Sequence, residues 1–514
     1  MNHIFIYGPP GTGKTTLGDI LARRLKLPFV DLDHAIETKV GMAIPDIMEQ
    51  RGESFFRDME TSTLKSVIGG EESIIALGGG SLLREKNRAM VEKKGKVVLL
   101  KAEYETLLNR VEFDSTNRPL LKGDVPDKLS ALLAKREKHY DSFPLKVCVD
   151  GKTAEQNAFQ VQVALGQFHL SAMGQYDVIV QNHGMAQIGE LLHSRNLKNP
   201  IIVTDENVAR LHAGKVVSSL GKLGFNPKVL TVPAGESHKT LDTVSYLWHE
   251  FIENTLDRKS TVVALGGGVV CDLAGFAAST FMRGVSWVAL PTTLLSMVDA
   301  ALGGKTGFDL PEGKNLIGSF YPPNLVLADP DLLNTLPNIE LTCGLAEVVK
   351  HGIISDPELF KMCGNSLEWV KDRLEEIVKR AMAVKIQIIE QDPYEKGFRA
   401  ALNFGHTVGH AVELVSGYQI RHGEAVAIGM VAEAQLAERL KIAEGGLSGT
   451  IAELLSVFGL PTSIPKDLPR EAILRSMRTD KKRSNGIIRF ALPAKIGRIE
   501  LVDVDDLAIV LEEG

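Results

Sequence analysis

Short apolar runs, each ending at or near glycine or aspartate, recur through the first domain-sized part of the chain. They are HIFIYG (3–8), FVDLD (29–33), SIIALGGG (73–80) and KVVLLKA (96–102). Runs of this length are typical of buried strands, and helical patterns separate them. The order of strand, glycine turn and helix predicts an open parallel sheet with helices on both sides.

The same pattern begins again near Tyr176 and changes after about residue 335. Apolar runs stand at YDVIVQ (176–181), NPIIVTDENV (199–208), PKVLTVPAGE (227–236) and STVVALGGGVV (260–270). Further on, the strands stop, and helical periodicity predicts long helices over 367–390 and 424–444. We therefore predict an α/β fold of three domains, with a linker somewhere within 150–175. The predicted domains are a first α/β domain at 1–165, a second α/β domain at 166–335 and an all-helical domain at 336–514.

The length and charge of the chain agree with this division and exclude several classes of protein. A chain of 514 residues is too long for one hydrophobic core, and a net charge of −6 without a basic block indicates no binding of nucleic acid. The longest uncharged stretch, 156–176, contains Gln, Ser and His, so no membrane span is expected. Four cysteines without a CxxC pair predict neither disulfides nor a thiolate metal site, which fits a reducing cytoplasm. A strand is predicted from residue 3, so no signal peptide is expected.

The first candidate site is the glycine-rich segment GPPGTGKT, Gly8 to Thr15, between a predicted strand and a predicted helix. Glycine lets successive backbone N–H groups face a phosphate chain, and the following helix presents its positive N-terminus. In this pattern Lys14 reaches the β- and γ-phosphates and Thr15 ligates magnesium. We therefore expect a nucleoside triphosphate site in the first domain.

Acidic and basic residues follow the next predicted strands. We expect Asp31 and Asp33 at the end of the second strand, on one side of it because strand side chains alternate. One can then help to hold magnesium and the other a substrate hydroxyl, although strand-end aspartates also cap helices. The stretches FR, NRPLL and REKHY bring Arg57, Arg118 and Arg136. Taken singly, each arginine is more typical of a solvated surface.

Nearly all of the first domain resembles shikimate kinase. The resemblance is carried by six stretches in order: the phosphate-binding segment GPPGTGKT (the P-loop), DLD, FR, GGG, RPLL and RxxxY. The resemblance implies ATP with Mg²⁺ as the phosphoryl donor and shikimate as the acceptor. It implies that Lys14, Asp33 and Arg118 are catalytic, with Arg118 on a lid. It also implies that Thr15 and Asp31 position magnesium. The implied ATP-binding residues are Gly11, Thr12, Gly13, Lys14, Thr15, Thr16 and Arg118, and the implied shikimate-binding residues are Asp33, Arg57, Gly79, Gly80 and Arg136.

A second glycine triplet, Gly266 to Gly268, also lies between a predicted strand and a predicted helix. Alone it is a weak signal for a nucleotide phosphate. The stretches TDEN and PAGESHK strengthen it, because they bring polar residues to the ends of neighbouring strands, where ligands of open sheets collect. Two glycine-flanked turns then carry Lys305 and Lys314, although lysine gains nothing from a tight turn. With Arg283 they suit a phosphorylated, acidic substrate.

Three histidines and a glutamate, in three stretches that predict separate helices, make a candidate metal site. Glu347 stands in GLAEVVKHG, His406 and His410 stand in NFGHTVGHAVE, and His422 stands in RHGEAVAIGM. One carboxylate and two or three imidazoles meet the needs of a catalytic zinc ion with an open position. Each histidine alone is more typical of a buried, hydrogen-bonded residue. The spacing of four between His406 and His410 leaves open whether both are ligands.

The stretches from TDENV to HGEAVAIGM resemble 3-dehydroquinate synthase across the second and third domains. The resemblance implies NAD and Zn²⁺ (or Co²⁺) as cofactors and a seven-carbon keto acid phosphate as substrate. The implied zinc ligands are Glu347, His406 and His422, and the implied catalytic residues are Asp299, Lys305, Lys350, Lys385 and His410. The implied NAD-binding residues are Asp205, Asn207, Glu236, Lys239, Gly267, Gly268, Val269, Asp272, Thr292, Thr293, Lys305 and Lys314. The implied substrate-binding residues are Arg283, Lys305, Asn315, Lys350, Lys385, Arg399, Asn403, His410, Lys481 and Lys482.

The two resemblances together imply a fusion of two enzymes of the shikimate pathway to chorismate and aromatic amino acids. One half would phosphorylate shikimate to 3-phosphoshikimate with ATP. The other would convert 3-deoxy-D-arabino-heptulosonate 7-phosphate to 3-dehydroquinate: a hydroxyl is oxidised by bound NAD, phosphate leaves, and the carbonyl is reduced before ring closure. Zinc would polarise that hydroxyl as a Lewis acid. A cytoplasmic homodimer formed through the synthase half is expected, with small-molecule substrates and no nucleic-acid or membrane partner.

Other classes of protein stand as alternatives. An AAA-type ATPase would pair the P-loop with IIVTDEN at 201–207, but about 190 residues separate these motifs. A metal-dependent polyol dehydrogenase shares the glycine and histidine pattern, although the lysines that suit a phosphate would then be superfluous. Cyclases of other sugar phosphates stay open, as does a fusion with one inactive half.

Overall fold

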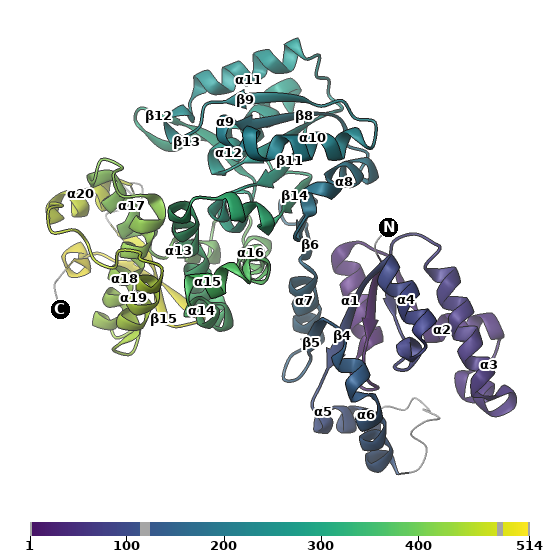
Figure 1. Ribbon diagram of the computed structural model, residues 1–514. Helices are drawn as coiled ribbons and strands as arrows, with labels where there is room; N and C mark the ends of the chain where they lie inside the picture. The colour runs from purple at the N-terminus through teal and green to yellow at the C-terminus, as the bar shows by residue number, and fades with distance from the viewer. Residues whose placement is uncertain (1–2, 114–123, 481–486, 512–514) are drawn as a thin grey trace. The chain divides into compact units, whose positions relative to one another are not determined.

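The computed structural model describes residues 3–113, 124–480 and 487–511. The chain forms two compact units, Met1–His169 and Leu170–Gly514 (Figure 1). Their boundary falls within the stretch where the sequence predicts a linker. Most of that stretch is regular, because α7 (Ala154–Leu165) and β6 (Gln167–Leu170) occupy it. The further division of the larger unit near residue 335 stays a prediction.

In the described part of the first unit, a five-stranded parallel sheet has the order β2-β3-β1-β4-β5. The strands are β1 (His3–Tyr7), β2 (Phe29–Asp31), β3 (Ile74–Ala76), β4 (Gly95–Lys101) and β5 (Leu145–Cys148). Side chains alternate along β1, so Phe5 and Tyr7 pack into one apolar layer, and Ile4 and Ile6 pack into another layer on the opposite face. The sheet is therefore buried on both faces, and the predicted parallel α/β fold is confirmed.

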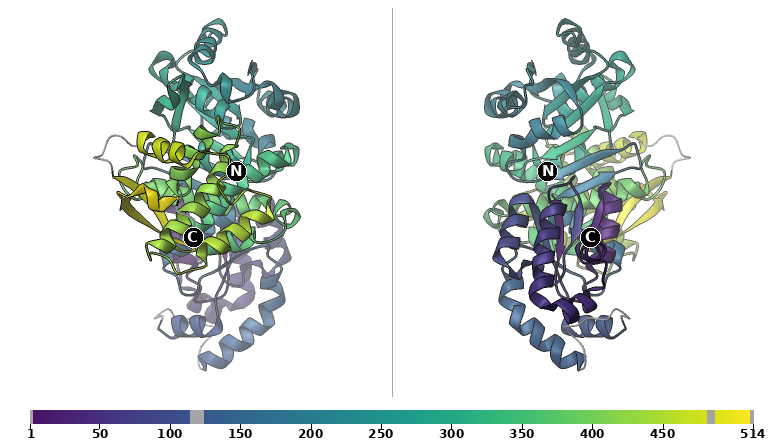
Figure 2. Two further views of the ribbon diagram at one scale, coloured as in Figure 1. Left: turned by 90° about the vertical axis from the view of Figure 1, so that its left-hand side faces the viewer. Right: turned by 90° about the vertical axis from the view of Figure 1, so that its right-hand side faces the viewer.

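Helices cover both faces of this sheet (Figures 1 and 2). They include α1 (Lys14–Leu25), α2 (Leu32–Val40), α3 (Ile44–Val67), α4 (Glu85–Lys94), α5 (Tyr104–Phe113), α6 (Val125–Asp141) and α7. The prediction that Asp31 and Asp33 share a strand is wrong, since β2 ends at Asp31 and Asp33 lies in the first turn of α2. The cause is local: the Asp31 carboxylate accepts hydrogen bonds from the backbone N–H groups of Asp33 and His34 and so starts the helix.

The larger unit begins with an α/β region whose sheet, over the described residues, has the order β6-β7-β14-β11-β10-β8-β9. Its strands are β6, β7 (Tyr176–Val180), β8 (Lys198–Asp205), β9 (Lys228–Val232), β10 (Ser260–Gly266), β11 (Ser286–Pro291) and β14 (Leu325–Ala328). Helices α8 (Ile188–Ser194), α9 (Glu206–Val208), α10 (Gly214–Gly221), α11 (Leu241–Glu253) and α12 (Gly268–Thr280) connect them. Every residue of β10 is buried, and α12 starts directly after it. The glycine triplet therefore lies at the carboxyl end of a central strand, as its sequence predicts.

A separate antiparallel hairpin, β12 (Lys305–Leu310) and β13 (Gly313–Phe320), follows β11 in the chain. The prediction that Lys305 and Lys314 lie in turns is wrong, since both lie on strands of this hairpin. Positive φ angles occur just before the hairpin at Gly303 and Gly304, where such backbone favours glycine, and within β13 at Asn315, directly after Lys314.

The C-terminal region is helical, as predicted. Its helices are α13 (Asn338–Ser355), α14 (Pro357–Cys363), α15 (Leu367–Lys371), α16 (Leu374–Gln391), α17 (His406–Val415), α18 (His422–Arg439), α19 (Leu447–Val457) and α20 (Arg470–Asp480). The structure adds an antiparallel hairpin that the sequence analysis missed, β15 (Ile488–Lys495) and β16 (Arg498–Val504), the yellow arrows in Figure 2. It is integral to the region because Ile488, Phe490 and Leu492 join the apolar core around α18. No helix within the described ranges is long and apolar enough to span a bilayer.

Candidate functional sites

The phosphate-loop segment of the first unit connects β1 to α1. Gly11 and Gly13 have φ angles of 82° and 80°, in the left-handed region that glycine adopts without strain. The Lys14 ammonium donates to the Gly8 and Pro9 carbonyls, each at 3.0 Å, and so lies over the loop. The predicted ATP-binding residues Gly11, Thr12, Gly13, Lys14, Thr15 and Thr16 thus surround one helix N-terminus, where a phosphate chain is favoured.

Two oxygen ligands suited to a divalent cation meet beside this loop. The Thr15 hydroxyl donates to Asp31 Oδ2 at 2.6 Å, while Asp31 Oδ1 caps α2. Both interpretations that the sequence left open for Asp31 are therefore compatible, since each uses a different carboxylate oxygen. A hydroxyl and a carboxylate next to a phosphate cradle are the donor types that Mg²⁺ prefers, so these residues fit the ion.

Asp33 lies next to this pair and has an unusual charge environment. Burial and, to a smaller extent, the charge of the neighbouring Asp31 raise the pKa of its carboxyl to about 6, although Lys14 opposes the shift. A carboxylate whose pKa lies close to neutrality can accept a proton from a substrate hydroxyl.

The turn Gly78 to Gly80 leaves space for three charged side chains. A Cβ on Gly78 would lie 2.9 Å from Asp33 Oδ1. A Cβ on Gly80 would lie 3.0 Å from Arg57 Nη2 and 3.4 Å from Arg136 Nη2. The glycines therefore allow a carboxylate and two guanidinium groups to converge on one short turn.

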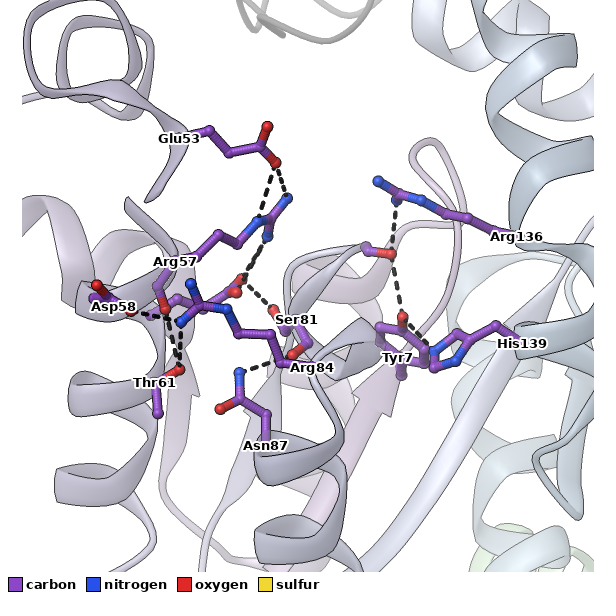
Figure 3. Close-up of polar contacts among 12 residues, drawn as sticks. Tyr7, Glu53, Arg57, Asp58, Thr61, Ser81, Arg84, Asn87, Arg136 and His139 are labelled. Atoms are coloured by element: carbon purple, nitrogen blue, oxygen red, sulfur yellow. Dashed lines mark hydrogen bonds and ion pairs between the residues drawn. The ribbon is translucent and has the colours of Figure 1, made fainter. Parts of the chain in front are cut away.

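Each arginine is held in place by groups of the protein (Figure 3). Arg57 Nη1 lies 3.1 and 3.2 Å from the two carboxylate oxygens of Glu60, and the Ser81 hydroxyl donates to Glu60 at 2.6 Å. Arg136 donates through Nη1 to the Gly79 carbonyl at 2.9 Å. Two oriented guanidinium groups beside one glycine turn suit a small carboxylic acid.

Sequence reasoning missed Glu60, although it stands three residues after Arg57 in FRDME and so shares its helix face. Burial was the missing information, because Glu60 is 1% exposed. Arg118 lies outside the described residues, as do Lys481 and Lys482, and their predicted roles stay predictions.

In the larger unit, an open cleft of about 2380 Å³ collects most of the second predicted site. The predicted residues that line it are Asp205, Asn207, Glu236, Lys239, Gly267, Gly268, Val269, Asp272, Thr292, Thr293, Asp299, Lys305, Lys314, Asn315, Lys350, Lys385, Arg399, Asn403, His406, His410 and His422. Glu347 is fully buried behind the wall. Arg283 does not line the cleft: it follows the carboxyl end of α12, roughly 20 Å of helix away from Gly268. The expectation that Arg283 reaches this cleft is therefore not met within the chain.

One end of the cleft suits a dinucleotide. Gly267 is the N-cap of α12, so backbone N–H groups of the first turn face the cleft without a side chain in the way. Beneath the turn, Lys239 is 4% exposed and contacts Asp272 at 2.7 Å and Asn315 at 2.6 Å. Burial raises the pKa of Asp272 to about 6, although Lys239 opposes the shift. A glycine turn at the carboxyl edge of a parallel sheet is the usual position for a nucleotide phosphate.

At the helical wall of the cleft, Glu347, His406 and His422 offer ligand atoms that lie within 4.8 Å of one another. Glu347 Oε1 is 3.4 Å from His406 Nε2 and 3.7 Å from His422 Nε2. The other ring nitrogen of each histidine is occupied: His406 Nδ1 lies 3.2 Å from the Phe404 carbonyl, and His422 Nδ1 lies 3.3 Å from Glu413. Partners of this kind orient an imidazole so that its Nε2 binds a metal.

The charges around these groups also fit a metal ion. The Glu347 carboxylate is 0% exposed and lacks a hydrogen bond of good geometry within the described residues, although Lys350 pairs with it. Burial lowers the pKa of His422, but Glu347 and Glu413 outweigh burial and raise it to about 9. The pocket therefore attracts positive charge. One carboxylate and two imidazoles match the ligands of a catalytic zinc site with an open position.

His410 lies next to this cluster but differs from it. Its ring centroid is 5.0 Å from that of His406 and 5.8 Å from that of His422. His410 is exposed to the cleft, and its possible metal-binding neighbours are Glu413 and His422 rather than Glu347. Because the buried carboxylate needs the cation most, the geometry favours His406 over His410 as the ligand.

Paired charges line the remaining wall. Lys385 donates to Asp299 Oδ1 at 2.6 Å, and Lys305 contacts Glu395 at 2.6 Å. Asn403 donates to the same Glu395 at 3.1 Å. A phosphorylated acid entering the cleft can replace these carboxylates as the partner of the cations. Sequence reasoning missed Glu395.

Comparisons with known proteins find relatives of both units of the chain. Family models match residues 10–165 (shikimate kinase), 229–343 (3-dehydroquinate synthase N-terminal) and 344–483 (3-dehydroquinate synthase C-terminal). The chain is 45% identical over 331 residues to a 3-dehydroquinate synthase of Symbiobacterium thermophilum, covering 63% of this chain and 92% of the relative. It is 42% identical over 336 residues to that of Rippkaea orientalis, covering 64% and 92%.

Two solved structures resemble the larger unit. The first is 2-deoxy-scyllo-inosose synthase complexed with carbaglucose-6-phosphate, NAD⁺ and Co²⁺, at 27% identity and a TM-score of 0.61 over 67% of this chain and 98% of the other. The second is 2-epi-5-epi-valiolone synthase from Streptomyces hygroscopicus with NAD⁺ and Zn²⁺ bound, at 27% identity and a TM-score of 0.60 over 65% and 94%.

Proposed function

Since the chain belongs to the 3-dehydroquinate synthase family and also carries a shikimate kinase domain, we propose that it catalyses two reactions of the shikimate pathway. The first unit transfers a phosphoryl group from ATP to shikimate and forms 3-phosphoshikimate. The larger unit converts 3-deoxy-D-arabino-heptulosonate 7-phosphate to 3-dehydroquinate and releases phosphate.

The convergence of Asp33, Arg57 and Arg136 on the Gly78 to Gly80 turn supports the proposed kinase reaction. The two guanidinium groups hold the carboxylate of shikimate, which orients its ring. Asp33 accepts the proton of the attacking hydroxyl, a role that its raised pKa favours. Lys14 and the loop N–H groups hold the phosphates of ATP, and Arg118 closes over them. Thr15 and Asp31 would hold Mg²⁺, which neutralises charge on the transferred phosphoryl group.

The cluster of Glu347, His406 and His422 at the wall of a cation-lined cleft supports the proposed synthase reaction. These residues would hold Zn²⁺ or Co²⁺, and the α12 turn would hold NAD; together the two cofactors supply hydroxyl polarisation and reversible hydride transfer. Lys385 and its cationic neighbours bind the phosphate and carboxylate of the keto acid. His410, exposed at the cleft, donates a proton to the departing phosphate.

Relatives also support this substrate over that of another cyclase. The two synthases that share 45% and 42% identity with this chain are 3-dehydroquinate synthases, whereas the two cyclases of other substrates share 27%. We also propose that the larger unit forms a homodimer, which light scattering of the purified chain can test.

Both reactions can be tested on the full-length chain. We expect ADP to form only when shikimate is present, and phosphate to leave the keto acid phosphate only with NAD and a divalent metal. ATP hydrolysis without shikimate would instead indicate a motor ATPase. Net accumulation of NADH would indicate a polyol dehydrogenase, because the proposed reaction returns its hydride.

A further inference from the structure

Tyr7 is a fully buried polar residue next to the proposed shikimate-binding site. Neither the glycine-rich segment that follows it nor the proposed kinase reaction assigns it a role. It ends the central strand β1 and is 0% exposed. Its ring packs against His139 and Tyr140 of α6 and against Phe143. A buried phenol generally requires a hydrogen-bond partner for its hydroxyl. Burial raises the pKa of Tyr7, so the hydroxyl keeps its proton at neutral pH.

Two acceptors lie within reach of that single proton (Figure 3). The Tyr7 hydroxyl is 3.2 Å from the Gly79 carbonyl oxygen and 3.1 Å from His139 Nε2. The Gly79 oxygen also accepts from Arg136 Nη1 at 2.9 Å and from the Tyr140 hydroxyl at 2.8 Å. A carbonyl oxygen has two lone pairs, and these shorter bonds use both. Because both lone pairs of the Gly79 oxygen are already used, we infer that the Tyr7 hydroxyl donates its proton to His139.

The state of His139 agrees with this assignment. Burial lowers the pKa of His139, and the nearby Arg88 and Arg136 lower it further. The ring is therefore neutral at neutral pH and has one nitrogen that accepts a hydrogen bond. His139 lies on α6 one turn after Arg136, so a bond from Tyr7 fastens this helix to the central strand.

The same hydrogen bonds connect Arg136, a proposed shikimate-binding residue, to the sheet. Gly79 packs closely against the phosphate loop, because a Cβ on it would lie 3.1 Å from the Gly8 carbonyl, and it lies beside Arg136, whose Nη1 would be in ordinary contact with that Cβ at 3.8 Å. The position of the Arg136 guanidinium thus depends on where α6 and the Gly79 carbonyl are held. Resting on the proposed kinase function, we propose that Tyr7 and His139 are positioning residues that set the affinity for shikimate through Arg136, without touching the substrate.

The test is Tyr7→Phe in the full-length chain, which keeps the ring and removes only the hydroxyl. We expect the KM for shikimate, and its Kd from calorimetric titration, to rise about 3- to 10-fold, the worth of one hydrogen bond. We expect kcat and the KM for ATP to stay within about twofold of wild type. The matched control is Tyr104→Phe, which also removes a phenol hydrogen bond to α6, the one to the Pro126 carbonyl at 3.0 Å.

Two variants of His139 test the partner. His139→Gln retains a side-chain amide that can bond to Tyr7, so we expect shikimate affinity close to wild type. His139→Leu cannot bond to it and should match Tyr7→Phe, while the double variant Tyr7→Phe/His139→Leu should show no further loss. If Tyr7→Phe does not fold, His139→Leu at its partly exposed position carries the same test.

Three results would overturn the inference. In the first, Tyr7→Phe melts at a lower temperature but binds shikimate with the affinity of wild type, which would show that Tyr7 has a purely structural role. In the second, the KM for ATP rises as much as that for shikimate, which places the effect on the adjoining phosphate loop. In the third, Tyr104→Phe has the same effect. Each presumes that the wild-type chain phosphorylates shikimate; a wild type that does not would refute the kinase function, and the inference with it.

Discussion

The two candidate sites of this chain organise their charged groups in different ways. In the first unit, each arginine is held by a fixed protein partner: Arg57 by Glu60, and Arg136 by the Gly79 carbonyl. In the larger unit, the charges hold each other in pairs such as Lys385 with Asp299 and Lys305 with Glu395. At its centre, a buried glutamate and two imidazoles converge on one point.

The difference shows what each site requires before it can act. The proposed shikimate-binding site of the first unit is pre-organised, because Glu60 and the Gly79 carbonyl hold the two guanidinium groups in place and little rearrangement is needed. In the cleft of the larger unit, acidic and basic side chains neutralise each other in pairs. A bound metal ion or substrate must therefore replace existing partners. Substitutions should therefore act on metal content and turnover in the larger unit, and on substrate affinity in the first.

The largest effect should come from separating the two histidines of α17. We expect His406→Ala to lose bound metal and to lower the proposed cyclisation by more than ~1000-fold, because a ligand to the Lewis acid is removed. His410→Ala should retain the metal and lower turnover by about 100-fold or more, because a proton donor is removed. Metal content by atomic emission, measured beside phosphate release, distinguishes the two.

Shikimate-dependent ADP formation by the same preparations is the control, and it should not change. Equal loss of metal in both variants would contradict the assignment of His410 and would make both histidines of the HTVGH spacing ligands. The contrast drawn between the two sites would then be weaker, because the cleft would hold its metal ion with four protein ligands and not with the three that the geometry favours.

A smaller effect is expected at Glu413, which contacts His422 Nδ1 at 3.3 Å and Lys314 at 2.9 Å. It joins a strand of the β12–β13 hairpin to a candidate metal ligand. We expect Glu413→Gln to weaken metal affinity by about 10- to 100-fold, because it removes the charge that orients the imidazole. Titration of the metal-free protein with Zn²⁺ measures this directly.

Glu424→Gln is the matched control on α18, since Glu424 accepts from the backbone N–H of Arg421 and a glutamine can do the same. Its metal affinity should equal that of wild type. Excess Zn²⁺ should restore activity to Glu413→Gln if positioning is the cause. Lost activity at full metal occupancy would show that Glu413 acts on the substrate instead.

The sequence predicted those parts of the fold and sites that depend on local backbone chemistry. The parallel α/β order follows from apolar runs and glycine turns, and the helical C-terminal region follows from periodicity. Local rules failed where one side chain redirected the backbone, as Asp31 does when it caps α2 and moves Asp33 into a helix. They also missed the β15–β16 hairpin, whose buried positions depend on contacts with α18.

Partners of the site residues were the least predictable part. Tyr7, Glu60, Glu395 and Glu413 act on residues that are mostly distant in sequence, and a single chain does not show such contacts. Glu413 had one visible signal, since it lies seven residues after His406 and therefore on the same helix face. Arg283 is the reverse case, because its charge suits the substrate but it does not line the cleft of its own chain, so its predicted role stays a prediction.

The pH dependence of the kinase reaction should sharpen the comparison further. Because the pKa of Asp33 is raised to about 6, the carboxyl gains a proton as pH falls through 6 and can no longer accept one from shikimate. We expect kcat/KM for shikimate to fall about tenfold per pH unit below that value. Initial rates from pH 5 to 8, at saturating ATP, measure the profile.

The stability of Asp33→Asn provides an independent check on the same pKa. A folded-state pKa above the ordinary 3.8 means that Asp33 favours folding below that value and loses this contribution as pH rises through about 6. The uncharged variant should therefore be inactive yet melt at a higher temperature than wild type at pH 8, with no gain at pH 4. A pH-independent difference would contradict the raised pKa.

The smallest effect should come from adding one methyl group to the glycine turn of the first unit. In Gly80→Ala the new Cβ would lie 3.0 Å from Arg57 Nη2 and 3.4 Å from Arg136 Nη2, so both guanidinium groups must shift by a few tenths of an ångström. Long side chains can make that shift, and we expect the KM for shikimate to rise only about 3- to 10-fold with kcat preserved. Gly69→Ala, whose nearest neighbour would be the Ser66 carbonyl at 3.4 Å, should leave the KM unchanged. A loss of kcat in Gly80→Ala would mean that the turn positions the reacting groups themselves, and that the first site is less tolerant than its hydrogen-bonded arginines indicate.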